Sequence, residues 1–91
     1  MLVMILEKVP RGLRGELSRW MIEPKSGVFT GNVSALVRDK LWQKATKQTR
    51  SGGGILQIWS DNSEQGFSVR SWGETARQLV DFEGLYLVRM P

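Results

Sequence analysis

Cysteine and histidine are both absent from the 91 residues of this chain. Without cysteine there is no disulfide, no zinc-thiolate site and no thiol nucleophile, which fits a reducing compartment, and we expect the protein to be cytoplasmic. Without histidine there is no Ser-His-Asp triad and no imidazole metal ligand. Any catalysis must therefore use carboxylates, which bind hard cations such as Mg²⁺ or Mn²⁺.

Long hydrophobic runs are also lacking. The N-terminal apolar run covers residues 2–6 and stops at Glu7. A membrane helix needs about 20 apolar residues, and the apolar region of a signal peptide is longer than this one. We therefore expect neither a signal peptide nor contact with a membrane.

What the chain does have is the apolar fraction of a folded domain and an excess of positive charge. Hydrophobic residues make up 41% of the sequence, and 13 lysines and arginines outnumber 9 acidic residues, which gives a net charge of +4. We expect one domain spanning residues 1–91. A chain of this size buries only about 60–65% of its unfolded surface, so dimerisation would help it. The charge favours a polyanionic partner such as nucleic acid.

The first part of the chain predicts a strand followed by a helix. Residues 2–6 are typical of a strand buried on both faces. Val9-Pro10 forces an extended turn, and the helix behind it can run to about Ile22, because Pro24 cannot continue it. The residues on its apolar face, expected in the core, are Leu13, Leu17, Trp20 and Met21.

The remaining pattern completes a two-layer fold. The other expected segments are strands at residues 28–30, 55–60, 67–72 and 85–89, a helix from an Asn32 cap to about Gln48, and a loop at residues 73–81. The order β-α-β-α-β-β-β predicts an α+β, ferredoxin-like two-layer sandwich, in which two helices cover an antiparallel sheet.

The last expected strand, at residues 85–89, is apolar on both faces. So small a chain has little left to cover it. We therefore expect residues 79–91 to be a C-terminal strand segment for dimer or partner contact, added to the sheet edge of a neighbour.

Two arginines, Arg11 and Arg14, lie near the start of the first expected helix. The positive end of the helix dipole points to the same edge as Glu7, so the sequence predicts an anion site there. Nothing in the chain resembles a base-reading element, so contacts should be to phosphates and independent of base sequence. The three glycines at 52–54 are typical of a linker rather than a phosphate loop, because no Gly-Lys-Ser/Thr follows them.

Several short motifs occur in a fixed order along nearly the whole chain. They are the strand ending in Glu7, Val9-Pro10, Arg14-Gly15, residues 27–34, Gly66-Phe67, residues 80–85 and Leu87-Val88. In order and spacing they resemble CRISPR-associated protein two of the subtype I-E systems. The resemblance implies a ferredoxin-like fold and a symmetric homodimer between two dimers of the larger CRISPR integrase subunit. It also implies that the assembly holds a double-stranded DNA prespacer.

This resemblance leads us to expect a non-sequence-specific, duplex-DNA-binding scaffold subunit of the spacer-acquisition complex. We assign site residues on the same basis and from the placement of the basic side chains. The residues assigned to nucleic acid are Arg11, Arg14, Arg38 and Arg77. The residues assigned to the partner interface are Glu64, Glu83, Leu85, Leu87 and Val88.

An alternative function of the chain depends on Glu7. Many members of the wider family have aspartate at the end of the first strand, where it binds the metal of a nuclease. The alternative is therefore a Mg²⁺- or Mn²⁺-dependent endonuclease or endoribonuclease that acts through Glu7 at the dimer interface. The longer arm of glutamate moves the ligand atom, which weakens a preorganised site. The subtype also tends to carry paired arginines in the late loop, where this chain has Ala76-Arg77.

An RNA-recognition module of the RRM kind is a rival from another class, since it is also built on a ferredoxin-like sheet. Residues 66–72 resemble its Gly-aromatic strand motif. In that module the motif strand lies between the two helices, whereas here it follows both. Trp42, Trp59 and Trp72 fit the core, a partner surface or base stacking, and the sequence leaves these roles open.

Overall fold

The computed structural model describes residues 1–73 and the backbone of two further strands, at 79–82 and 85–88. The elements in chain order are β1 (Leu2–Glu7), α1 (Arg11–Leu17), β2 (Ile22–Lys25), β3 (Val28–Gly31), α2 (Ala35–Gln48), β4 (Gly54–Ser60), β5 (Phe67–Gly73), β6 (Leu79–Phe82) and β7 (Leu85–Val88). Neither helix in these residues has the length and apolar character needed to cross a membrane.

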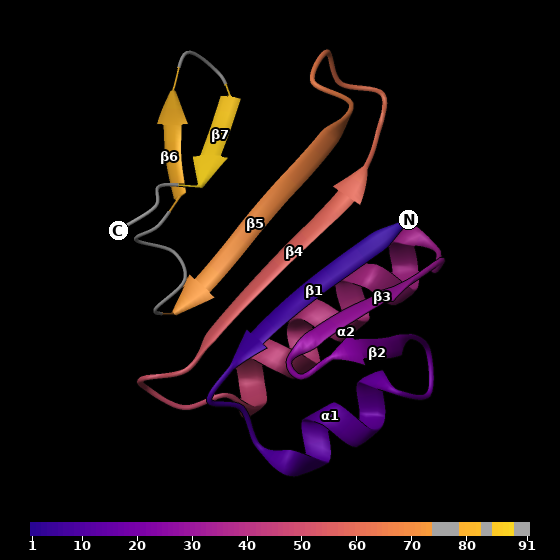
Figure 1. The fold of residues 1–91 in the computed structure, drawn as a ribbon, viewed down its shortest axis with the longest axis vertical. Coiled ribbons are helices and arrows are strands. Elements are labelled where there is room, and N and C mark those ends of the chain that lie inside the picture. Colours follow the sequence, from indigo (N-terminus) through magenta and orange to yellow (C-terminus); the bar gives the residue numbers. More distant parts are fainter. Residues whose placement is uncertain (74–78, 83–84, 89–91) are drawn as a thin grey trace.

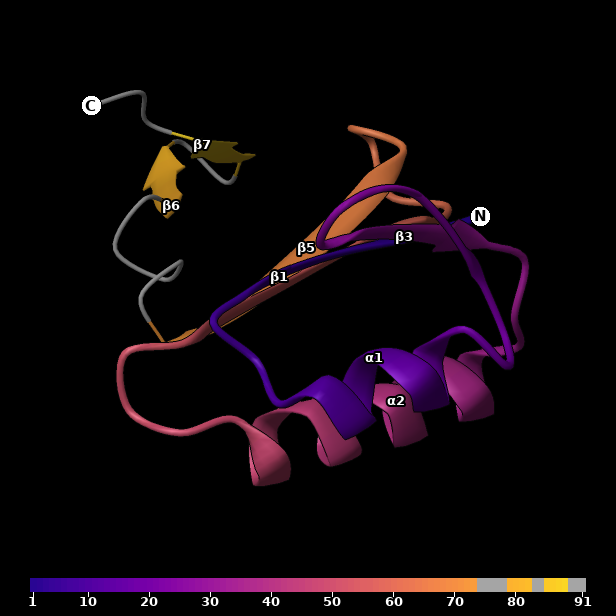
Figure 2. The ribbon, with the colours of Figure 1, turned by 60° about the horizontal axis from the view of Figure 1, so that its bottom comes forward.

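Five strands form one antiparallel sheet in the order β2-β3-β1-β4-β5. The central strand β1 pairs with β3 on one side and with β4 on the other. The unit β1-α1-β2-β3-α2-β4 has the connectivity of a ferredoxin-like sandwich, and β5 extends its sheet as a hairpin partner of β4. Both helices lie side by side on the same face of the sheet (Figures 1 and 2). The predicted fold class is confirmed.

The structure differs from the expected elements in two segments, residues 18–25 and residues 73–81. The first helix ends at Leu17 rather than near Ile22, and Ile22–Lys25 is the edge strand β2. A proline is tolerated there because an edge strand has backbone N–H groups that need no partner in the sheet, so Pro24 marks a strand as well as a helix end. The predicted loop at residues 73–81 contains a second missed strand, β6.

The turn between β2 and β3 requires glycine. Gly27 has a φ of +81°, and a Cβ atom at this position would lie 2.6 Å from the carbonyl oxygen of Leu6. The Leu6 N–H donates to the Gly27 carbonyl at 2.8 Å. This bond fixes the β2–β3 turn beside the end of β1, next to Glu7.

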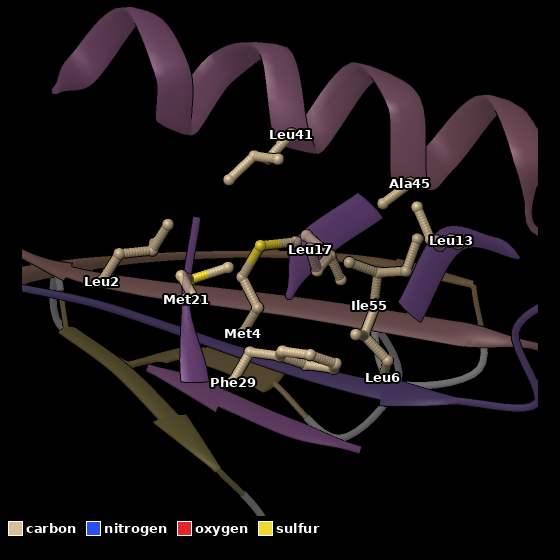
Figure 3. Close-up of a cluster of buried hydrophobic side chains, with 10 residues drawn as sticks. All are labelled: Leu2, Met4, Leu6, Leu13, Leu17, Met21, Phe29, Leu41, Ala45 and Ile55. Carbon is tan, nitrogen blue, oxygen red and sulfur yellow. The ribbon is translucent and has the colours of Figure 1, made fainter. Parts of the chain in front are cut away.

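The hydrophobic core lies between the helices and one face of the sheet (Figure 3). Alternate residues of β1 point into it, and α2 contributes Leu41 and Ala45. The N-cap of α2 is Ser34 rather than the expected Asn32, and the Ser34 hydroxyl accepts the Val37 N–H at 3.2 Å. The buried cluster consists of Leu2, Met4, Leu6, Leu13, Leu17, Met21, Phe29, Leu41, Ala45 and Ile55.

The other face of the sheet has no helix over it in the part of the chain that the structure describes (Figure 2). Cross-strand pairs such as Val3 with Ile58 and Ile5 with Leu56 make this face apolar. Most of its side chains are only half-buried. We call it the bare face and define it by Val3, Ile5, Val28, Leu56, Ile58 and Val69.

The strands β6 and β7 pair with each other and form a separate two-stranded sheet (Figure 1). The expected partner residues Leu85, Leu87 and Val88 lie in β7. A lone two-stranded hairpin has marginal stability in water. This hairpin therefore needs a surface to pack on.

Candidate nucleic-acid interface

Arg14 reaches from α1 to the turn between β2 and β3. Its guanidinium pairs with the carboxylate of Glu23 and donates to the Ser26 hydroxyl at 3.1 Å. The same oxygen of Glu23 accepts the backbone N–H of Gly27 at 2.8 Å. The Gly27 N–H and then Arg14 hold the pKa of Glu23 below its ordinary value. Glu23 is therefore ionised at neutral pH and neutralises Arg14.

A polar hollow of about 230 Å³ lies beside this pair, between Lys8, Arg14 and the Ser26-Gly27 turn. Lys8 directly follows β1 and has a φ of +54°, a left-handed conformation that costs free energy for a residue with a side chain. Two cations therefore border one hollow. Only one of them, Arg14, has an acidic partner among the described residues.

Arg11 is the first residue of α1 and its side chain is exposed. It makes no ion pair or side-chain hydrogen bond with the rest of the described chain. The helix has seven residues, and its N-cap, Pro10, has no side-chain acceptor. The positive potential at this edge therefore comes mainly from the side-chain cations rather than from a long helix.

Glu7 is exposed and lies at the end of β1, opposite Gly54 of β4. Strand alternation places its side chain on the same face as Val3 and Ile5. Among the described residues, no three His, Cys, Asp or Glu side chains come together as a metal site. The donors of one described chain therefore do not fit a metal ion at Glu7.

Arg38 lies on α2, in a cluster with Arg70 of β5. The Arg38 guanidinium stacks 4.2 Å from the centre of the Trp59 ring, and Arg70 lies 4.7 Å from that of Trp42. Both arginines donate to Asp39 Oδ1, Arg38 at 3.1 Å and Arg70 at 2.8 Å. The bond from Arg70, followed by that from Arg38, lowers the pKa of Asp39. Cation–π stacking and ion pairing thus hold both guanidinium groups against the fold.

Gln57 joins this cluster to the core. It is fully buried, donates to the Arg38 backbone carbonyl at 2.9 Å and accepts from Arg70 Nε at 2.7 Å. A buried amide that satisfies both ends stabilises one arrangement of α2 against β4 and β5. Trp42 and Trp59, which the sequence left open, pack against the core and against the two arginines.

The structure separates the predicted basic residues into two places. Arg11 and Arg14 lie near the Glu7 end of β1, where Gly27 bonds to Leu6. Arg38 lies near the other end, where Trp59 pairs with Leu2. Leu2 and Leu6 are four positions apart along β1, which corresponds to about 13 Å.

Three further predicted site residues are Glu64, Arg77 and Glu83. Glu64 is exposed in the connection between β4 and β5. Arg77 and Glu83 lie outside the described residues. The sequence prediction missed Lys8, Glu23 and Arg70. Lys8 could have been found from its place directly after Glu7, whereas the partners of Glu23 and Arg70 come from other elements.

A protein-family model described as CRISPR-associated protein (Cas_Cas2CT1978) matches residues 1–87. The match covers both helices, all five strands of the main sheet and the β6–β7 hairpin up to Leu87.

Proposed function

This chain belongs to the Cas2-type family of CRISPR-associated proteins, and we propose that it is the DNA-binding scaffold subunit of a spacer-acquisition complex. Its role lies in a CRISPR system. Within that system we assign it the binding of duplex DNA without sequence preference, as a cytoplasmic homodimer that bridges two dimers of the larger integrase subunit.

The bare face is the observation that carries this proposal. An apolar sheet face without a covering layer leaves half of the sheet's packing incomplete, and a second copy can supply the missing layer. The cations Lys8, Arg11 and Arg14 lie at one end of this sheet. Two-fold pairing would therefore present two such sets on one rigid body, which suits a duplex whose two strands are also related by two-fold symmetry.

Phosphate groups are the ligands that suit these cations. Arg14 already binds an anion of the fold, the Glu23 carboxylate, and a DNA phosphate would compete with it. Lys8 and Arg11 have no such competitor among the described residues. We therefore assign the first contact to Lys8 and Arg11, with Arg14 joining when a phosphate replaces Glu23. Arg38 is a weaker assignment because Asp39 and Trp59 hold its guanidinium.

The β6–β7 hairpin is our choice for contact with a second copy or with the integrase subunit. Its strands have no place in the main sheet, and a hairpin of this kind gains stability by packing on a partner. Leu85, Leu87 and Val88 would supply that contact, with Glu64 and Glu83 as its polar partners.

The salt dependence of duplex binding tests the DNA assignment. Arg14→Ala should lower the log-log slope of affinity against salt by about 1 per chain, or about 2 per dimer. Glu23→Gln should raise affinity at low salt, because it removes the carboxylate that competes for Arg14. Fluorescence anisotropy with two duplexes of unrelated sequence measures both effects, and Lys47→Ala, an exposed cation on α2, is the matched control. If the wild type and the three variants all had the same slope, Arg14 would have a purely structural role.

A metal-dependent nuclease remains the second candidate, because Glu7 lies on the side of the sheet that we assign to dimer contact. A second chain would then bring a second Glu7, and the pair would be the carboxylate ligands of Mg²⁺ or Mn²⁺. Any cleavage of duplex DNA or single-stranded RNA should need a divalent cation and Glu7. Glu7→Gln should abolish cleavage while leaving duplex binding unchanged. Cleavage that survives this substitution or excess chelator would exclude the Glu7 pair.

A further inference from the structure

A groove between α1 and α2 lies on the layer of the molecule away from the sheet. Its volume is about 330 Å³. Val37 and Leu41 of α2 line it on one side, and Trp20, in the turn after α1, lines it on the other. Figure 2 shows the two helices side by side on the outer layer. We call this the α1–α2 groove.

Trp20 is the unusual member of this groove. Its spacing from Leu13 and Leu17 predicts a core residue, but its side chain is 55% exposed. Since α1 ends at Leu17, the chain turns and Met21 takes the buried position, at 5% exposure. An indole left at the surface beside aliphatic side chains is the type of residue that dominates the binding energy of protein interfaces.

The rim of the α1–α2 groove is positively charged. Arg19, Lys40 and Lys44 stand around it, and Glu16 is the one acidic residue among those that line it. The Glu16 carboxylate lies 3.6 Å from Lys44 Nζ. Three cations against one carboxylate leave a net charge of +2, and neither Arg19 nor Lys40 has an ion-pair partner among the described residues.

We propose that the α1–α2 groove docks a segment of another protein that carries an apolar side chain flanked by carboxylates. The apolar side chain would enter between Trp20 and the Val37–Leu41 wall, and the carboxylates would pair with Arg19 and Lys40. Charge complementarity selects an acidic segment, because a neutral or basic apolar segment would leave the two unpaired cations beside it without partners. The α1–α2 groove is separate from the polar hollow beside Lys8 and Arg14, because the Arg14 side chain points to the β2–β3 turn, where it contacts Glu23 and Ser26.

A protein segment fits the groove better than nucleic acid. Single-stranded nucleic acid needs a charged track for successive phosphates and aromatic faces for successive bases. The α1–α2 groove has one aromatic side chain, and its opposite wall is aliphatic. Such a short hollow holds one or two anchoring side chains, as a peptide motif does.

The test is fluorescence anisotropy of the full-length protein with labelled probes. The main probe is a peptide in which a central Leu-Phe pair is flanked on both sides by glutamates. One comparison peptide replaces Leu-Phe by two serines, another replaces every glutamate by lysine, and a third probe is an oligothymidine of matched charge. The wild type should bind the main probe more tightly than any comparison probe.

Two substitutions, one in the turn after α1 and one on α2, decide the assignment. Trp20→Ala should weaken binding of the main probe about tenfold or more. Lys40→Glu should weaken it severalfold at low salt and flatten its salt dependence, because it removes a charge that attracts the probe. Phe67→Ala, at another exposed aromatic residue, and Lys47→Glu, elsewhere on α2, should leave binding unchanged. Circular dichroism confirms that each variant is folded.

Three results would overturn the proposal. The first is no binding of the main probe, or equal binding of the serine peptide. The second is binding that neither Trp20→Ala nor Lys40→Glu changes. The third is tighter binding of oligothymidine that Trp20→Ala removes, which would make the α1–α2 groove a nucleic-acid site. The Arg14 salt slopes report on duplex binding separately, so either proposal can fail without the other.

Discussion

The two faces of the main sheet carry the same kind of side chain but differ in what covers them. On the helix side, Met4 and Phe29 are fully buried between the sheet and the two helices. On the bare face, their strand neighbours Ile5 and Val28 are apolar but only half-buried. Burial on the two faces therefore follows the helical layer more than the composition of the strands. On the bare face, Leu56 alone among the residues that define it is buried, at 8% exposure.

Polar side chains on the two faces differ in whether they have hydrogen-bond partners within the described chain. Gln57 is buried on the helix side and satisfies both ends of its amide. Glu7, at the edge of the other face, has no hydrogen-bond or ion-pair partner among the described residues. A satisfied polar group fixes a fold, whereas an exposed carboxylate remains available for a partner or a ligand.

The largest expected effect is on the helix side. Phe29→Ala should destabilise the fold by about 3–5 kcal/mol, because it leaves a cavity at the centre of the core. Val28→Ala, one residue away on the bare face, should cost only about 1 kcal/mol in the isolated chain. Urea denaturation at low protein concentration measures both values. Equal losses would show that the two faces are equally packed within one chain.

The next effect concerns assembly. Ile58→Lys should abolish the homodimer that we propose while the chain remains folded, because an unpaired charge buried in an interface costs about 3–5 kcal/mol. Gln43→Lys adds the same charge at an exposed position of α2 and is the matched control. Analytical ultracentrifugation distinguishes monomer from dimer. A dimer that survives Ile58→Lys would place the interface elsewhere on the molecule.

Much of the fold could be predicted from the sequence because its signals are local. The apolar run of β1, the alternation of β4 and β5, and the length of α2 all follow from side-chain periodicity. The strand β2 was missed because its four residues, Ile22–Lys25, contain a proline and lie at a sheet edge. Only the pairing with β3, a tertiary contact, makes this segment a strand.

The site was less predictable, because its contacts join separate elements. Arg14 and Glu23 are nine residues apart and meet only when α1 folds over the β2–β3 turn. Arg70 reaches Asp39 across 31 residues. Periodicity placed Arg14 and Arg38 off the apolar stripes of their helices, but it contained no information about the carboxylates that pair with them.

The smallest expected effect is the response of the two faces to acid. The carboxylate of Asp39, at the margin of the helix side, has a pKa below its ordinary value of 3.8, because Arg70 and Arg38 stabilise its ionised form. The pKa of Glu23 is lowered in the same sense, first by the Gly27 N–H and then by Arg14. A lowered pKa means that the unfolded chain binds the proton more tightly than the folded chain does. The stabilisation is therefore complete above the ordinary pKa and is lost as the pH falls through the lowered value. The urea concentration at the unfolding midpoint should therefore decrease as the pH is lowered from about 5 to about 2, and we call this decrease the acid limb.

Asp39→Asn should lower the midpoint at pH 7 slightly and make this acid limb less steep, because it removes one of the contributing carboxylates. Glu7→Gln, which removes a carboxylate that has no partner among the described residues, is the matched control. An acid limb that Asp39→Asn leaves as steep as in the wild type would mean that the Arg70–Asp39–Arg38 contact adds nothing to the stability of the helix side.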